Sequence, residues 1–254
     1  PEDVERIDID LGDQPGCRIR APGVRENRGV LYLHGGGYVM GSLDTHQELM
    51  ARISRALDAT VFGLDYRLAP EHPWPAAVDD AVAAWDALSA HGLAPEQTIV
   101  AGDSAGGGLS VALLLALKVR GAALPAGAVV FSPWTDLTGS GESMTSRAEA
   151  DPMINPDALE PMAAHYHAGA DPKSPTLSPL FGDLGGLPPL LIQVGDAEIL
   201  LDDAVRLHER AKASGSPSTL HVFDEAFHVF QAVPVVPEAA EALDEMAGFC
   251  SSLW

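Results

Sequence analysis

The chain has 254 residues, of which 46% are hydrophobic, and a formal net charge of −21. That hydrophobic content excludes a disordered chain. The acidic excess repels phosphate groups, so we expect neither a nucleic acid nor an anionic membrane as a partner. The longest apolar run, 109–117, is too short to span a bilayer, and no signal peptide opens the sequence. We therefore expect a cytoplasmic protein, in which Cys17 and Cys250 are reduced thiols.

Strand-like and helix-like segments alternate along the chain. A short antiparallel pair is predicted first, at 4–10 and 16–20. Further strands, read from continuous apolar runs, are expected at 29–34, 60–65, 98–101, 127–131, 190–194 and 218–223. Helices are expected at 47–57, 76–90, 105–120, 203–214 and 238–251. This order predicts an α/β fold, with a mostly parallel eight-stranded sheet covered by helices on both faces.

The rhythm breaks between residues 140 and 189, where prolines punctuate the chain. We expect an irregular excursion there, over the carboxyl edge of the sheet, with one helix near 156–167. The segment cannot bury a core of its own, so the whole chain, 1–254, is predicted to be a single domain.

The run Gly102-Asp103-Ser104-Ala105-Gly106 fits the pattern Gly-x-Ser-x-Gly. A predicted strand leads into it and a long predicted helix leads out, which is the arrangement of a nucleophile elbow. The flanking glycines avoid collisions with the neighbouring strand and helix. The helix N-terminus also favours a developing negative charge. We predict that Ser104 is the nucleophile of a serine hydrolase.

Three consecutive glycines follow the predicted strand at 29–34, in the run His34-Gly35-Gly36-Gly37-Tyr38. Glycines in series let a backbone approach a bound group closely. No Lys-Ser/Thr pair follows, which argues against a phosphate loop. The N–H groups of Gly36, Gly37 and Ala105 are therefore predicted to form an oxyanion hole.

Three motifs occur in a fixed order: His-Gly-Gly-Gly-Tyr at 34–38, Asp-Tyr-Arg-Leu-Ala-Pro-Glu-His at 65–72 and Gly-Asp-Ser-Ala-Gly-Gly at 102–107. Together they resemble the bacterial hormone-sensitive-lipase-like esterases, a family with the α/β-hydrolase fold. The resemblance implies hydrolysis of short-chain carboxylic esters without a cofactor. Members of that family usually carry N-terminal helices that cap the site. This sequence starts close to its first predicted strand, so we expect that cap to be largely absent.

The general base is expected after the last strand, because the chain order in this fold is serine, acid, histidine. His208 lies in a charged predicted helix and His221 within a predicted strand. His228 follows the last strand among apolar residues, which help to keep an imidazole neutral. It also matches the family's His-Gly-Phe-like motif, with Val229 in place of the usual glycine. His228 is the predicted base.

The acid has two candidates after the predicted strand at 190–194. The family pattern Gly-x-x-Asp-x-Leu-x-Asp, laid from Gly195, places the acid at Glu198. Asp196 is the rival, and either carboxylate could orient the histidine. We favour Glu198. Asp202 is expected to cap the following helix and steady the loop.

Other chemistry-bearing residues receive plainer interpretations. The segment 65–71 is expected to form a hydrogen-bonded turn that braces the oxyanion loop. His165 and His167 face different directions on a helix, so no metal site is predicted. Tyr38, Trp134 and Phe181 are candidates for lining the substrate pocket.

The predicted reaction is two-step acyl transfer on a small ester, through an acyl-enzyme on Ser104. A lactone hydrolase or an N-acetyl deacetylase would use the same triad. A non-catalytic small-molecule receptor on this fold is the alternative outside enzymes, and it is disfavoured because serine, acid and histidine are all present. The family resemblance leaves both a monomer and a homodimer open.

Overall fold

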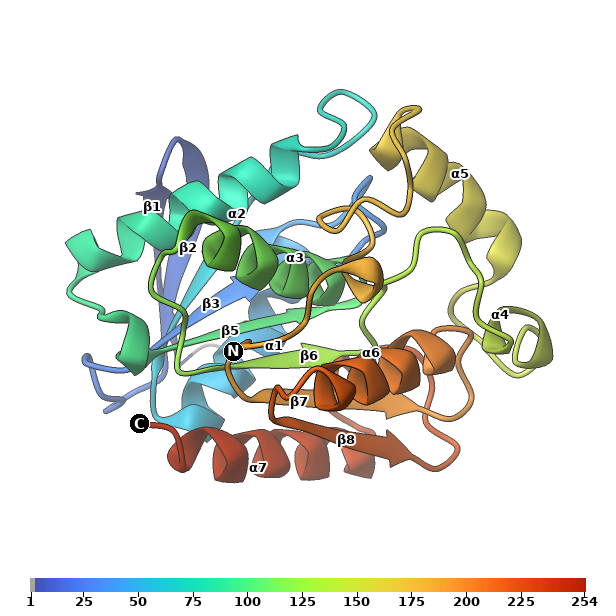
Figure 1. The fold of residues 1–254 in the computed structure, drawn as a ribbon. Coiled ribbons are helices and arrows are strands. Elements are labelled where there is room, and N and C mark those ends of the chain that lie inside the picture. Colours follow the sequence, from blue (N-terminus) through green and yellow to red (C-terminus); the bar gives the residue numbers. More distant parts are fainter. Residues whose placement is uncertain (1–2) are drawn as a thin grey trace.

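The structure, a computed structural model, describes residues 3–254. Its strands form one eight-stranded sheet, as the sequence predicts, and their order is β1-β2-β4-β3-β5-β6-β7-β8 (Figure 1). Both β1–β2 and β2–β4 are antiparallel, and every other pairing is parallel. The strands are β1 Glu5–Leu11, β2 Gln14–Arg20, β3 Gly29–Leu33, β4 Thr60–Leu64, β5 Thr98–Asp103, β6 Gly127–Phe131, β7 Leu190–Gly195 and β8 Ser218–Phe223.

The helices lie close to the predicted ranges. They are α1 Leu43–Leu57, α2 Ala76–Ala87, α3 Ser104–Arg120, α4 Ser143–Ser146, α5 Pro156–His167, α6 Leu201–Ala213 and α7 Pro237–Ser251. Short 3₁₀ segments occur at η1 Leu88–His91, η2 Pro95–Gln97, η3 Pro179–Phe181 and η4 Phe230–Ala232. None of the helices in the described residues is both long and apolar enough to cross a membrane.

Helix α1 begins four residues before the predicted start at 47, because a capping box at Ser42 and Thr45 satisfies its first N–H groups. Each of these two hydroxyls accepts a hydrogen bond from the other residue's N–H, at 3.0 and 3.4 Å.

Successive residues of the central strands pack on opposite faces of the sheet. In β3, Leu31 and Leu33 join one apolar cluster, which also holds residues of α2, α3, α5 and α6. Val30 and Tyr32 join a second cluster with residues of α1 and α7. A strand buried on both faces must be apolar throughout, and β3 is fully buried.

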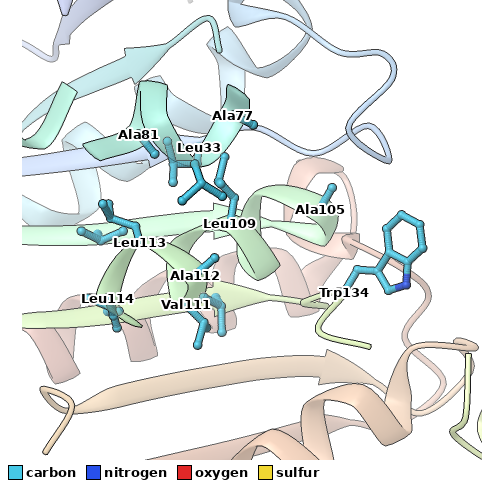
Figure 2. Packing of buried hydrophobic residues seen from close by; sticks show 14 of the residues in the cluster. Leu33, Ala77, Ala81, Ala105, Leu109, Val111, Ala112, Leu113, Leu114 and Trp134 are labelled. Carbon is cyan, nitrogen blue, oxygen red and sulfur yellow. The ribbon is translucent and has the colours of Figure 1, made fainter. Parts of the chain in front are cut away.

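Helix α3 is the most buried helix, and it holds the nucleophile elbow against the sheet. Figure 2 shows Leu109 of α3 beside Leu33 of β3 and the alanines of α2. The alanines Ala77 and Ala81 are completely buried, and their small side chains let α2 approach α3 closely. Helix α3 is therefore packed against both the sheet and α2.

Helices α4 and α5 lie beyond the carboxyl ends of the parallel strands (Figure 1). Helix α5 packs on the glycine loop that follows β3. Its Tyr166 ring stacks on Tyr38 with centroids 3.7 Å apart. A Cβ placed on Gly37 would lie 2.4 Å from the sulfur of Met162. The excursion at 140–189 thus touches the predicted oxyanion loop directly.

Candidate active site

Ser104 stands at the junction between β5 and α3, in the left-handed region at φ 52°. This conformation is strained for a non-glycine residue, and it turns the side chain out of the strand. The turn is tight enough to exclude neighbouring side chains. A Cβ on Gly102 would lie 2.4 Å from the carbonyl oxygen of Gly106, and one on Gly106 would lie 2.0 Å from that of Leu33. The flanking glycines are therefore required by close backbone contact, as predicted.

A chain of two hydrogen bonds joins the predicted serine, histidine and acid. His228 Nε2 lies 3.0 Å from Ser104 Oγ, and His228 Nδ1 lies 2.7 Å from Glu198 Oε2. A carboxylate only accepts, so Nδ1 carries the proton and Nε2 accepts from the serine hydroxyl. Ser104 is 9% exposed, His228 6% and Glu198 0%. All three residues are thus buried, and Ser104 is the most exposed of them.

Glu198 and Asp196 have different partners. Beyond His228, the Glu198 carboxylate accepts hydrogen bonds from the N–H of Gly195 and the hydroxyl of Ser132, both at 2.7 Å. Asp196 accepts instead from the N–H of Glu225 at 2.7 Å. Of the two candidates, Glu198 is thus the one in contact with the histidine.

Asp202 is not the cap that the sequence suggests. Helix α6 begins at Leu201, so Asp202 is already its second residue. Its carboxylate accepts instead from the N–H of Ser143, at 2.9 Å. The loop-steadying part of the expectation holds, because this bond ties α6 to α4. The capping part is wrong, because the helix starts two residues earlier than predicted.

Sequence reasoning also missed Ser132 and Asp151, which support the acid and its loop. Ser132 follows β6 at φ 46°, and its hydroxyl accepts from the N–H of Val229 at 3.0 Å while donating to Glu198. The Asp151 carboxylate accepts from the N–H of Ile199 at 2.9 Å. Ser132 could have been suspected from its place at the carboxyl end of a central strand, where parallel-sheet proteins gather functional groups. For Asp151 the sequence carries no signal.

Burial and charge act in opposite directions on His228. Desolvation disfavours its imidazolium, but the hydrogen bond and negative charge of Glu198 outweigh this effect, with smaller contributions from Asp151 and Asp103. The pKa of His228 therefore lies above the ordinary histidine value. An imidazole with a raised pKa binds a proton more readily than an ordinary histidine does.

The glycine loop follows β3, which pairs with β5, the strand that leads into Ser104. Gly36 and Gly37 adopt φ values of 120° and 62°. A Cβ on Gly36 would lie 2.1 Å from the carbonyl oxygen of Met40, so no other residue fits there without moving the backbone. Ala105 is the second residue of α3, and its N–H has no acceptor within the helix.

The loop is braced from below by the segment predicted to do so. The Tyr66 hydroxyl donates to the carbonyl oxygen of His34 at 2.7 Å, and the N–H of Ala69 donates to that of Tyr38 at 2.9 Å. His34 Nδ1 lies 2.7 Å from the carbonyl oxygen of Gly35. Burial lowers the pKa of His34, which keeps its ring neutral. The predicted bracing turn is thus confirmed.

A cavity of about 500 Å³ lies between the loop at 134–145 and helix α5. Of the three predicted pocket residues, Trp134 lines this cavity. Its backbone N–H donates to the carbonyl oxygen of Ser104 at 2.9 Å. Tyr38 and Phe181 are not part of the lining. The ring of Tyr38 is 1% exposed in its stack with Tyr166, and that of Phe181 lies under the ammonium of Lys173.

Comparison with known proteins places this geometry in context. A family model for the alpha/beta hydrolase fold matches residues 30–232. An acetyl-hydrolase of Streptomyces hygroscopicus is 46% identical over 229 residues, which cover 90% of this chain and 77% of that protein. A crystal structure of an esterase from the bacterial hormone-sensitive lipase family is 47% identical, with a TM-score of 0.98 over 100% of this chain and 86% of that one. The structure of EstE5 soaked with p-nitrophenyl butyrate is 46% identical, with a TM-score of 0.97 over the same shares.

Proposed function

The chain belongs to the α/β-hydrolase fold family and is a carboxylic ester hydrolase related to the bacterial hormone-sensitive-lipase esterases; from that premise we propose that Ser104, His228 and Glu198 form its catalytic triad. The observation that carries the proposal is the unbroken hydrogen-bond chain, 3.0 Å from serine to histidine and 2.7 Å from histidine to glutamate. Both distances lie within the range that proton transfer requires.

In the acylation step, Nε2 of His228 takes the proton of the Ser104 hydroxyl while the serine oxygen attacks the ester carbonyl carbon. The carbonyl oxygen becomes an oxyanion, and the N–H groups of Gly36, Gly37 and Ala105 donate to it. The imidazolium of His228 then protonates the leaving alcohol oxygen, and the carbon–oxygen bond of the ester breaks.

In the deacylation step, water replaces the alcohol. His228 takes a proton from the water, whose oxygen attacks the acyl carbon, and then returns a proton to Ser104 as the acid product leaves. Glu198 stays ionised throughout. Its negative charge, 2.7 Å from Nδ1, stabilises the imidazolium that forms in both steps.

Turnover of p-nitrophenyl butyrate by the variants Ser104→Ala and Ser110→Ala tests the proposal. Ser110 lies on the same helix, and its buried hydroxyl donates to the carbonyl oxygen of Gly106, so it is a matched control. We expect Ser104→Ala to lose at least about 10³-fold in kcat and all labelling by a fluorophosphonate, with Ser110→Ala close to the parent. Undiminished turnover by Ser104→Ala would refute the assignment.

The acyl group is a second part of the proposal. The relative from Streptomyces hygroscopicus is an acetyl-hydrolase, which favours small acyl groups and raises N-acetyl amides as a second substrate class. An amine is a poorer leaving group than an alcohol and depends more on protonation by His228. Comparing kcat/KM for an acetate ester and the matched acetamide will separate an esterase from a deacetylase. A lactone with the same acyl chain tests ring opening.

We further propose that residues 140–189 form one wall of the substrate site within a single domain. The cavity beside Trp134, with Leu159 and Ala163 of α5 on its other side, supports this interpretation.

We also propose that the protein is cytoplasmic and that it assembles as a homodimer. The two cysteines are buried thiols, which suits a reducing compartment, and the edge strand β8 pairs only with β7 among the described residues. Sedimentation velocity measures the assembly state.

A further inference from the structure

Asp103, the residue before the proposed nucleophile, does not serve the helix that it precedes. It occupies the N-cap position of α3, yet its side chain makes no capping hydrogen bond. The carboxylate points instead toward the glycine loop, and the residue is 3% exposed. Its Oδ1 accepts from the hydroxyl of Tyr32 at 2.6 Å and from the N–H of Gly35 at 3.0 Å. A buried carboxylate is thus placed under the loop that the triad needs.

The other carboxylate oxygen of Asp103 meets a histidine of α1. His46 Nε2 lies 3.3 Å from Oδ2, and the His46 side chain is 15% exposed. The second ring nitrogen, Nδ1, lies 2.8 Å from the hydroxyl oxygen of Thr45 and 3.2 Å from the carbonyl oxygen of Ser42. The Thr45 hydroxyl has a single proton, which it can donate to the Ser42 carbonyl oxygen at 2.8 Å or to Nδ1. With that proton on the Ser42 carbonyl, both ring nitrogens face acceptors, and only an imidazolium donates from both.

The groups around His46 favour that charge. Asp103 is the carboxylate in contact with its ring, while the neutral ring of His34 lies nearby, tilted by 35° with centroids 5.5 Å apart, and the Tyr32 ring lies at 6.3 Å. Asp65 Oδ1 lies 4.0 Å from Nε2 of His34. Desolvation opposes protonation of His46, but the charge and hydrogen bond of Asp103 outweigh it, so the pKa of His46 is raised.

We propose that His46 is a positioning residue for ester hydrolysis: as an imidazolium it pairs with Asp103, and this pair fixes Gly35 and hence the oxyanion donors Gly36 and Gly37. The inference rests on the proposed function of these glycines. The backbone of Gly35 packs directly against the Asp103 carboxylate. A Cβ on Gly35 would lie only 2.2 Å from Oδ2 of Asp103. Any shift of Asp103 is therefore transmitted to the loop.

Loss of the His46 proton leaves Asp103 as a buried anion whose donors are all neutral: the Tyr32 hydroxyl, the N–H of Gly35 and the one N–H that His46 keeps. Such a charge is unfavourable, so the carboxylate moves toward solvent or takes up a proton, and the loop follows. The oxyanion donors act on the transition state more than on the bound ester, so the effect falls on kcat. Because the pKa of His46 is raised, this proton is lost above the ordinary histidine value, and kcat should decline there, which gives the profile an alkaline limb.

The test compares His46→Gln with His46→Lys and with His91→Gln, a control at an exposed histidine. His46→Gln keeps an N–H donor but removes the charge. We expect it to lower kcat on p-nitrophenyl butyrate by about 10-fold with KM within about twofold, and to weaken binding of a trifluoromethyl ketone transition-state analogue by a similar factor. His46→Lys keeps a charge to higher pH, so it should retain more kcat than His46→Gln and move the alkaline decline upward.

Three outcomes are distinguishable. If the parent enzyme hydrolyses the ester and His46→Gln has the parent's kcat and alkaline profile, the positioning role is overturned while the proposed function stands. If the parent and Ser104→Ala hydrolyse the ester equally, the proposed function fails first. If His46→Gln does not fold, the alkaline limb of His46→Lys decides, since a limb unchanged from the parent overturns the inference.

Discussion

The hydroxyl of Ser132 donates a hydrogen bond to Oε1 of Glu198 over 2.7 Å and accepts one from the N–H of Val229 over 3.0 Å. A single oxygen thus connects the proposed acid to the residue that follows the proposed base. The backbone of Ser132 is held at φ 46°, and its N–H donates to the carbonyl oxygen of Gln193 at 2.7 Å. The distance between Glu198 and His228 is therefore set by β6 and β7 together, through a residue outside the triad.

Ser132→Ala should lower kcat about 10-fold with little change in KM, because the carboxylate of Glu198 loses one of its donors and the loop carrying His228 loses an anchor. Steady-state kinetics on p-nitrophenyl butyrate measure both constants. Ser216→Ala is the matched control, since the buried Ser216 hydroxyl also joins two backbone groups, Leu184 and Leu187, away from the triad. Equal losses of kcat in the two variants would mean that Ser132 acts only on stability.

Glu198→Gln should cost more than Asp196→Asn. The glutamine has no charge to stabilise the imidazolium, and its amide N–H₂ can turn toward Nδ1 of His228 and disturb the tautomer. We expect a loss of at least about 10²-fold in kcat for Glu198→Gln, and a change within about threefold for Asp196→Asn, whose carboxylate contacts the N–H of Glu225. The reverse order of losses would transfer the role of the acid to Asp196.

The sequence determines most of this fold because its central strands β3 to β7 are buried on both faces and its helices are separated by glycine and proline. The strands β6 and β8 and the helix α5 lie at the predicted residues. The apolar period places the start of α1 too late, because the cap formed by Ser42 and Thr45 lies outside that period. The short α4 has a single turn, too few residues for any period to show.

In the candidate site, too, some contacts follow from sequence patterns and others do not. The hydrogen bond between His228 and Glu198 lies where spacing and chain order predict it. The contacts of Ser132 and His46 bring together residues 66 and 57 positions apart in the sequence, and they depend on backbone angle and strand neighbours rather than on a motif. Pattern reasoning therefore finds the groups proposed to react, and it misses the groups that contact and position them.

The pH dependence of kcat/KM reports the pKa of the proposed base, His228. His228 acts only when neutral, and its pKa is raised because Glu198 outweighs burial, so activity should rise with pH through a midpoint above the ordinary value of about 6.5. Glu198→Gln removes the carboxylate and leaves burial, which should move that midpoint down. Measuring kcat/KM of the parent and of the weakly active Glu198→Gln between pH 5 and 8 gives both midpoints. An upward move in Glu198→Gln contradicts the assigned electrostatics.

Gly36→Ala should abolish most activity without unfolding the protein. Its Cβ would meet the backbone oxygen of Met40 at 2.1 Å, so the donors of Gly36 and Gly37 must shift, and we expect kcat/KM to fall by at least about 10²-fold. Gly23→Ala is the control, because Gly23 also has a positive φ, 77°, but no atom lies within 4 Å of its Cβ position. Comparable activity losses in both variants would point to backbone strain instead of the collision.

Asp203 gives a prediction for stability. It is buried, its Oδ2 accepts from the N–H groups of Thr135 and Asp136 at 2.7 and 2.8 Å, and its Oδ1 has no protein partner in the described structure. Desolvation, with the charge of Asp136, raises the pKa of Asp203 to about 7. Between pH 4 and 7 the unfolded chain releases this proton while the folded chain keeps it, so this group lowers stability as the pH rises.

Asp203→Asn removes that titration, and its amide oxygen can still accept from the two N–H groups. Relative to the parent, the variant should therefore gain stability between pH 5 and pH 8, by on the order of 1–4 kcal/mol. Urea unfolding at the two pH values gives the two free energies of unfolding. The difference between them is diagnostic, because any packing cost of the asparagine is the same at both. If the difference between variant and parent is the same at both pH values, Asp203 is ionised in the folded protein across this range and is stabilised by the N–H groups that point at it.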